Sequence, residues 1–169
     1  MQPTHQEHRA TAPKQLGCAV ITVSDTRTLD NDTGGAAVVS HLETAGVGVV
    51  QRDIIPDEPA RMRLLLMQLA QRADVDAILL TGGTGITSRD LTYETVSSLF
   101  TKLLPGYGEV FRLLSYQQIG AAAILSRAVG GLVGQKVVLT MPGSPAAVNL
   151  AMEQIIIPEL AHLVREARR

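Results

Sequence analysis

Short apolar runs alternate with longer amphipathic stretches along the chain from residue 16 onward. The runs are rich in branched apolar side chains, which is typical of buried strands. They predict strands over residues 18–23, 47–55, 76–81 and 136–140. The second of these is weaker, because the polar residues 51–53 interrupt it.

Between the strands, apolar residues recur at three- and four-residue spacing and predict helices. The predicted helices cover residues 34–45, a segment after Pro59, a segment beginning near residue 91, residues 106–117 and residues 146–166. Gly46 ends the first helix, and Asp57 is a candidate N-cap for the second, with Pro59 in its first turn. Residues 26–33 read as a polar loop, and residues 121–132 fit neither pattern.

Strands that alternate with helices predict an α/β fold: a single-domain, three-layer αβα arrangement with a mostly parallel sheet flanked by helices. We expect this domain to span residues 16–169. Residues 1–15 are polar, contain two prolines and two histidines, and are expected to form a flexible tail.

Composition narrows the classes of function. The net charge is -1 and aromatic residues make up 3% of the chain, which argues against a nucleic-acid partner. No apolar run reaches the roughly 20 residues of a membrane span, and the N-terminus lacks the apolar core of a signal peptide. The single cysteine, Cys18, lies in an apolar run. We therefore expect a cytoplasmic protein without a membrane partner.

Small, polar and acidic residues follow the predicted strands. In an open parallel sheet, ligands bind beyond the carboxyl ends of the strands. Glycines there let backbone N–H groups form a cradle for anions. Two such turns at one edge favour a ligand pair with several phosphates. The strand ends carry Ser24-Asp25, Asp57, Thr81-Gly82-Gly83-Thr84-Gly85 and Pro142-Gly143-Ser144.

Acidic residues next to phosphate cradles predict a divalent cation, since Mg²⁺ binds one or two carboxylates together with phosphate oxygens. The candidates are Asp57 and Asp90. Each has a structural alternative, namely capping the helix that follows it. Arg89 could neutralise phosphate or pair with a surface carboxylate.

Several familiar signatures are absent. There is no G-x-x-x-x-G-K-[ST] of a P-loop and no G-x-S-x-G of a hydrolase elbow. The stretch 83–88 (GTGITS) lacks the third glycine of a Rossmann fingerprint. The four histidines show no metal-ligand spacing. Covalent catalysis by the protein is therefore not expected.

Six segments in order resemble the MoaB/MogA family of molybdenum cofactor biosynthesis proteins, in detail more closely its MoaB branch. They run through nearly all of the expected domain and are V23-S-D-T-R27, P56-D-E58, T81-G-G-T-G85 with R89-D-L-T92, P105-G-Y-G-E109 with F111-R112, L125-S-R-A128 and M141-P-G-S-P145.

The resemblance implies an enzyme that transfers AMP from ATP to the terminal phosphate of molybdopterin with Mg²⁺, giving adenylyl-molybdopterin and pyrophosphate. It implies that Asp57 and Asp90 are the catalytic pair and the Mg²⁺ ligands, and that Thr84, Ser115 and Ser126 bind molybdopterin. The expected phosphate and nucleotide site comprises Ser24, Asp25, Gly82, Gly83, Gly85, Arg89, Pro142, Gly143 and Ser144.

Two alternatives stay open at this stage. The chain could be a family member that binds molybdopterin without catalysis, or a different nucleotide enzyme such as a pyrophosphatase-like relative. The resemblance also implies a trimer or a dimer of trimers, and a downstream metal-insertion protein as a partner. The apolar residues of the last predicted helix could serve core or interface: Val148, Leu150, Met152, Ile155, Ile156 and Ile157.

Overall fold

The computed structural model describes residues 16–169, so the expected tail over residues 1–15 lies outside the described residues. The described chain forms one six-stranded sheet in the order β2-β1-β3-β6-β5-β4. The first four strands of this order run parallel, and β5 pairs antiparallel with both β6 and β4. The strands are β1 (Gly17–Val23), β2 (Gly48–Ile55), β3 (Ala77–Thr81), β4 (Lys102–Leu103), β5 (Gly130–Val133) and β6 (Lys136–Met141).

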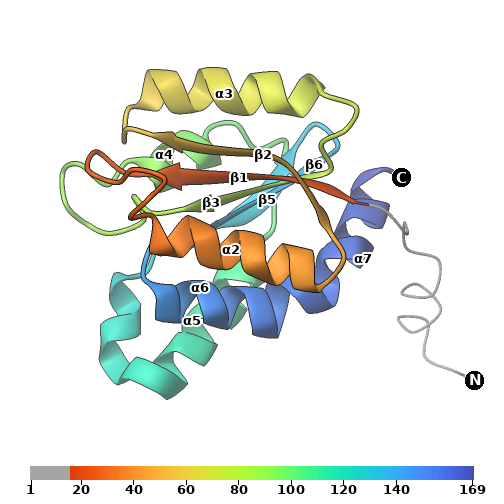
Figure 1. Ribbon diagram of the computed structural model, residues 1–169. Helices are drawn as coiled ribbons and strands as arrows, with labels where there is room; N and C mark the ends of the chain where they lie inside the picture. The colour runs from red at the N-terminus through yellow and green to blue at the C-terminus, as the bar shows by residue number, and fades with distance from the viewer. Residues whose placement is uncertain (1–15) are drawn as a thin grey trace, which may run out of the picture.

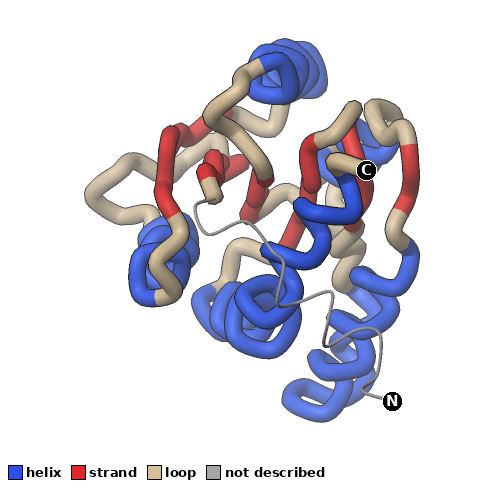
Figure 2. The backbone as a smooth tube through the Cα atoms, turned by 90° about the vertical axis from the view of Figure 1, so that its right-hand side faces the viewer, coloured by secondary structure: helices blue, strands red, loops and turns tan. Residues whose placement is uncertain are grey.

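Helices cover both faces of the sheet, as Figures 1 and 2 show. On one face lie α3 (Pro59–Gln71) and the short α4 (Thr92–Ser97). On the other lie α2 (Thr33–Thr44), α5 (Pro105–Ile119), α6 (Pro145–Ala151) and α7 (Ile157–Ala167). The predicted three-layer α/β fold with a mostly parallel sheet is confirmed.

Two apolar cores hold these layers together. Alternate residues of a strand point to opposite faces, so in β1 Cys18 and Val20 join the core under α2, α5, α6 and α7. Ala19 and Ile21 join the core under α3. Every residue of β1 and β3 is buried. Burial on both faces is the reason why these strands read as continuous apolar runs.

The weaker apolar pattern of β2 follows from its place at the edge of the sheet. Most of its residues are only half-buried. Its Arg52 donates to the buried carboxylate of Asp32 at 3.0 Å. Asp32 also accepts from the hydroxyl of Thr22 and caps α2 through the N–H of Gly35, at 2.8 and 2.9 Å. These bonds from Gly35, Arg52 and Thr22 lower the pKa of Asp32 although burial opposes them.

The last helix is continuous from Pro145 to Ala167 but contains a π turn over Met152–Ile156. Pro158 has no N–H to donate to the carbonyl of Gln154, and the helix widens just before it. By length and composition alone this helix could cross a membrane. Of the apolar residues that could serve core or interface, Val148, Leu150, Met152 and Ile156 are fully or nearly buried. Ile155 and Ile157 pack against the same core. All six residues therefore belong to the core.

Three elements were not predicted. Residues 121–132, which fitted neither pattern, form most of a 3₁₀ helix (Gly120–Leu125) and the start of β5. The third is the two-residue strand β4, which pairs with β5 at the end of the sheet order. All three elements are too short to show a period of their own in the sequence.

Candidate functional site

The carboxyl ends of the four parallel strands meet at one edge of the sheet. The N–H of Gly82, just after β3, donates to the carbonyl of Met141 at the end of β6 at 3.0 Å. The hydroxyl of Thr81 donates to the carbonyl of Pro142 at 3.2 Å. The two turns expected to hold phosphates, 82–85 and 142–144, therefore lie side by side.

The turn after β3 requires glycine at two positions. Gly82 and Gly83 have φ angles of +98° and +61°, which side chains other than glycine rarely adopt. A Cβ on Gly82 would lie 2.3 Å from the carbonyl oxygen of Val23. A Cβ on Gly83 would lie 2.3 Å from a carboxylate oxygen of Asp57. Glycine thus lets the turn approach both β1 and the Asp57 carboxylate.

A pocket of about 330 Å³ opens beside these turns. This is within the range of pockets that hold small ligands. It brings together nine of the fourteen residues that the sequence nominated, namely Gly83, Thr84, Gly85, Asp90, Ser115, Ser126, Pro142, Gly143 and Ser144. Ser144 is also the N-cap of α6, where its side chain accepts from the N–H of Ala147.

The far wall of this pocket is apolar and was missed in the sequence. It comes from α5, from the 3₁₀ helix and from Ala147 of α6, with Phe111, Ile119, Ala122, Ala123 and Leu125 as its other members. Phe111 stands in one of the family-like segments and could have been nominated from it. The residues of the 3₁₀ helix carried no periodic signal that would have placed them.

Asp90 lines this pocket, and its carboxylate bonds back to its own loop. It accepts from the N–H and the hydroxyl of Thr87 at 2.8 and 2.6 Å. These bonds, with that from the Thr87 hydroxyl the strongest, lower the pKa of Asp90. Asp90 does not cap α4, since the N-cap position is Leu91 and Asp90 instead closes the preceding turn. That alternative was wrong.

Asp57 lies behind the glycine turn and is 6% exposed. Both of its carboxylate oxygens accept from the N–H of Leu91 at 3.2 Å. Burial raises the pKa of Asp57, and the negative charges of Asp90 and Asp25 raise it further. The predicted N-cap role was wrong: Glu58 holds the N-cap position of α3 because Pro59 begins that helix. The Asp57 side chain reaches α4 instead.

Ser24, Asp25 and Arg89 lie outside the pocket. Arg89 pairs with Asp25 at 2.6 Å, and both side chains are largely exposed. The surface pairing considered for Arg89 is therefore present. The hydrogen bond from Arg89, with a second from the N–H of Asp57, lowers the pKa of Asp25.

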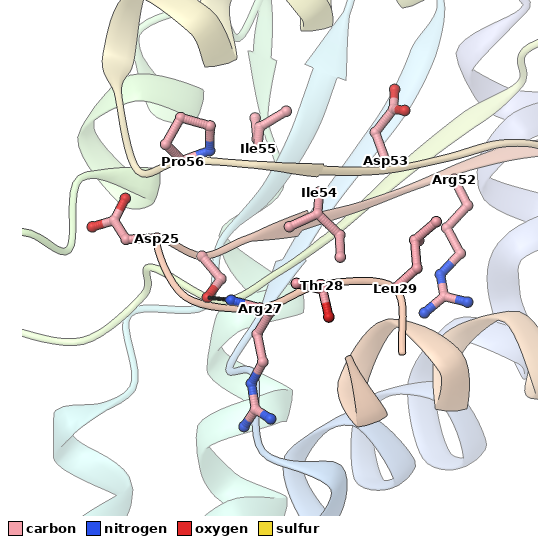
Figure 3. Close-up of a pocket in the computed structure, with 10 residues that line it drawn as sticks. Asp25, Arg27, Thr28, Leu29, Arg52, Asp53, Ile54, Ile55 and Pro56 are labelled. Atoms are coloured by element: carbon pink, nitrogen blue, oxygen red, sulfur yellow. Dashed lines mark hydrogen bonds between the residues drawn. The ribbon is translucent and has the colours of Figure 1, made fainter. Parts of the chain in front are cut away.

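Ser24 and Asp25 border a second, more open hollow of about 440 Å³ between the loop after β1 and strand β2. Figure 3 shows the Arg27 side chain pointing away from Asp25 and Arg52 further along β2. Ser24 accepts there from the N–H groups of Thr26 and Arg27, both at 3.2 Å. Nine of the nominated residues thus line the first pocket and two line the second hollow, whereas Asp57, Gly82 and Arg89 line neither.

The acidic residues at this end of the sheet suit a cation whose coordination is completed by a bound ligand. Among the described residues, no group of three or more His, Cys, Asp or Glu side chains could hold a metal alone. After burial, the negative charge of Asp90 is among the causes that raise the pKa of Asp57. Two carboxylates beside a phosphate cradle match Mg²⁺, which takes its remaining ligands from phosphate and water.

A parallel α/β domain with two glycine-containing turns and a partly apolar pocket beyond the carboxyl ends of its strands has the features of a domain that binds a small molecule. Residues 19–162 match the family model described as a probable molybdopterin binding domain, and the chain belongs to this family. The resemblance to MoaB and MogA is thereby confirmed.

Relatives agree with this assignment over nearly the whole chain. Molybdenum cofactor biosynthesis protein B of Halalkalibacterium halodurans is 52% identical over 162 residues, covering 95% of each chain. A crystal structure of a molybdenum cofactor biosynthesis protein B is 45% identical, with a TM-score of 0.90, and covers 94% of this chain and 99% of that one. The tungsten cofactor synthesizing protein MoaB from Pyrococcus furiosus is 39% identical, with a TM-score of 0.83 and coverages of 94% and 100%.

Proposed function

We propose that this protein acts in molybdenum cofactor biosynthesis by transferring AMP from ATP to the terminal phosphate of molybdopterin, with release of pyrophosphate. One observation carries the proposal: Asp90 and both glycine-containing turns line the same pocket as the hydroxyl groups of Thr84, Ser115 and Ser126. The family model, described as a probable molybdopterin binding domain, supports molybdopterin as one substrate. The two glycine-containing turns and the carboxylates of Asp57 and Asp90 support a second substrate that carries several phosphates.

Each wall of the pocket has a proposed part. Thr84 and Ser115 are buried, and with Ser126 they present hydroxyls to molybdopterin against the apolar wall of α5 and the 3₁₀ helix. Backbone N–H groups of Gly83, Gly143 and Ser144 hold phosphates, the last two in the turn that Pro142 begins. Gly82 and Gly85 shape the first turn, since their N–H groups bond to the carbonyl of Met141 and to the carboxylate of Asp90. Ser24, Asp25 and Arg89, beside the second hollow, take the rest of the nucleotide.

The reaction needs alignment and charge neutralisation rather than covalent chemistry from the protein. A terminal phosphate oxygen of molybdopterin attacks the α-phosphorus of ATP, the bond to the bridging oxygen breaks, and pyrophosphate leaves with its electron pair. The N–H groups of the turns donate to the developing charge. Asp57 and Asp90 would hold Mg²⁺, which neutralises phosphate charge when bound.

The direct test is turnover of the purified protein with molybdopterin, ATP and Mg²⁺. We expect adenylyl-molybdopterin and pyrophosphate in equal amounts, measured by chromatography and by a coupled pyrophosphate assay. Binding of molybdopterin without either product would identify a non-catalytic binder. Nucleotide cleavage that needs no molybdopterin would identify a different nucleotide enzyme. We also propose a cytoplasmic location, which the free, buried Cys18 supports.

We further propose a homotrimer or a dimer of trimers, which could hand its product to a metal-insertion protein. Large apolar side chains are exposed on α5 and the 3₁₀ helix, which favours a contact with another copy. They are Val110, Leu113, Tyr116, Ile119, Ile124 and Leu125.

Sedimentation velocity tests this assembly. The wild type is expected to sediment as three or six chains. Leu113→Glu on α5 is expected to dissociate the assembly, because burying an unpaired carboxylate in an interface is costly. The matched control is Leu64→Glu on α3, a residue that is equally exposed at 60% but lies on the opposite face of the sheet. A stable wild-type monomer would contradict the proposal.

A further inference from the structure

One basic side chain that the sequence analysis did not single out bonds to both ends of the loop 85–90, which carries Asp90. The guanidinium of Arg127 donates to the carbonyl of Gly85 at 2.6 Å and to the carbonyl of Asp90 at 2.7 Å. Its backbone N–H donates to the carbonyl of Thr84 at 3.2 Å. The four residues between these anchors, 86–89, are all exposed. Arg127 therefore links the two ends of the loop 85–90, which carries Asp90, through one side chain.

The guanidinium is itself held in place. It forms an ion pair with Glu94 of α4, and it lies 5.3 Å from the centre of the Tyr93 ring. The Arg127 side chain is about three-quarters buried. A planar group with five donors in fixed directions can satisfy two carbonyls and a carboxylate at once, which a lysine ammonium on a flexible stem cannot do in the same geometry.

Other bonds at these ends come from the backbone. The N–H of Leu91 donates to Asp57, the N–H of Thr92 donates to the carbonyl of Gly83, and the Asp90 carboxylate accepts from Thr87 and from the N–H of Gly85. The Arg89–Asp25 pair is solvent-exposed, where such pairs contribute little. Ser126, the neighbour of Arg127, lines the pocket. The segment 126–127 thus joins the wall of the substrate pocket to the acidic loop.

We propose that Arg127 is a positioning residue, which sets the direction of the Asp90 carboxylate by bridging the carbonyls of Gly85 and Asp90. The inference rests on the proposed adenylyl transfer for its kinetic consequence. It does not place Arg127 in contact with substrate.

Kinetics of three variants test the bridge. Arg127→Ala is expected to lower kcat by about 10²-fold, the scale expected for misplacement of a reacting group, with KM for ATP changed only a few-fold. Millimolar guanidinium ion is expected to restore at least a tenth of the lost kcat. Arg127→Lys, which keeps the charge but not the fork, is expected to stay impaired. Glu94→Gln removes the ion pair and leaves both carbonyl bonds, and it is expected to stay within about threefold of the wild type.

Hydrogen exchange of the Thr87 amide, which donates to Asp90, is a readout that needs no turnover. We expect faster exchange in Arg127→Ala and wild-type exchange in Glu94→Gln, with thermal melts confirming that both fold. Unchanged Thr87 exchange, wild-type kcat in Arg127→Lys, or no rescue by guanidinium would each overturn the inference. A wild type without any turnover would instead refute the proposed function, and the exchange comparison would still decide whether Arg127 orders the loop.

Discussion

Asp90→Asn is expected to lower kcat for formation of adenylyl-molybdopterin by about 10²- to 10³-fold, the scale seen when a preorganised electrostatic group is removed. Asparagine has nearly the same shape and can still accept from the N–H of Thr87, so the loop should persist. What is lost is the negative charge of a residue that lines the pocket. The pKa of Asp90 is lowered, chiefly by the Thr87 hydroxyl, so this charge is present at neutral pH.

A matched control for this variant is Asp74→Asn. Asp74 is an exposed carboxylate that pairs with Arg72, and it lies near the start of β1, at the opposite edge of the sheet from the pocket. We expect it to retain full turnover. Steady-state rates should be measured over a range of Mg²⁺ concentrations, because loss of a metal ligand raises the Mg²⁺ required. Turnover of Asp90→Asn within twofold of the wild type would remove Asp90 from the proposed mechanism.

Asp57→Asn is expected to have opposite effects on activity and stability. Turnover should fall by about 10²-fold or more, because the second proposed metal ligand is lost. The free energy of unfolding at pH 7 should rise by about 0.5–2 kcal/mol, the usual gain when an unfavourable functional group is relieved. The reason is that the charged form of Asp57 is disfavoured in the folded protein, by burial first and then by the charges of Asp90 and Asp25.

The direction of the pH dependence follows from the raised pKa of Asp57. The folded protein binds this proton more tightly than the unfolded chain, so the contribution of Asp57 to stability falls as pH rises from the unfolded pKa toward the folded one. Asparagine has no charge, so Asp57→Asn does not lose stability in this way. The gain in free energy of unfolding over the wild type should be full above the folded pKa of Asp57. It should vanish below the ordinary pKa of 3.8, where Asp57 is protonated in both states.

Urea unfolding without Mg²⁺ or nucleotide, repeated between pH 3 and pH 8, measures this effect. Asp74→Asn again serves as the comparison, because the pKa of Asp74 is lowered where that of Asp57 is raised. The hydrogen bond from Arg72 lowers the pKa of Asp74, so this variant should be no more stable than the wild type at pH 7. An Asp57→Asn protein that is less stable than the wild type at pH 7 would show that the bond to Leu91 outweighs the burial of charge.

Local sequence patterns were enough to predict the layers of this protein. The apolar runs of β1 and β3 are uninterrupted because helices cover both faces of the sheet there. The same reasoning explains the interrupted run of β2 at the sheet edge. Glycine and acidic residues after the strands predicted a site at the carboxyl edge, because a parallel sheet brings those ends together. The hydrophobic pattern predicts an element correctly wherever that element is long enough to show its period.

The tertiary structure alone decided which groups meet. The Asp57 carboxylate accepts from Leu91, 34 residues further on, and not from the helix beside it. Arg127 bonds to carbonyls 42 and 37 residues away, and part of the apolar wall of the pocket comes from a 3₁₀ helix without periodicity. A residue's neighbours in sequence determine its secondary structure. The partner of a polar side chain depends instead on which distant segment packing brings within about 3 Å, and no local pattern records that distance.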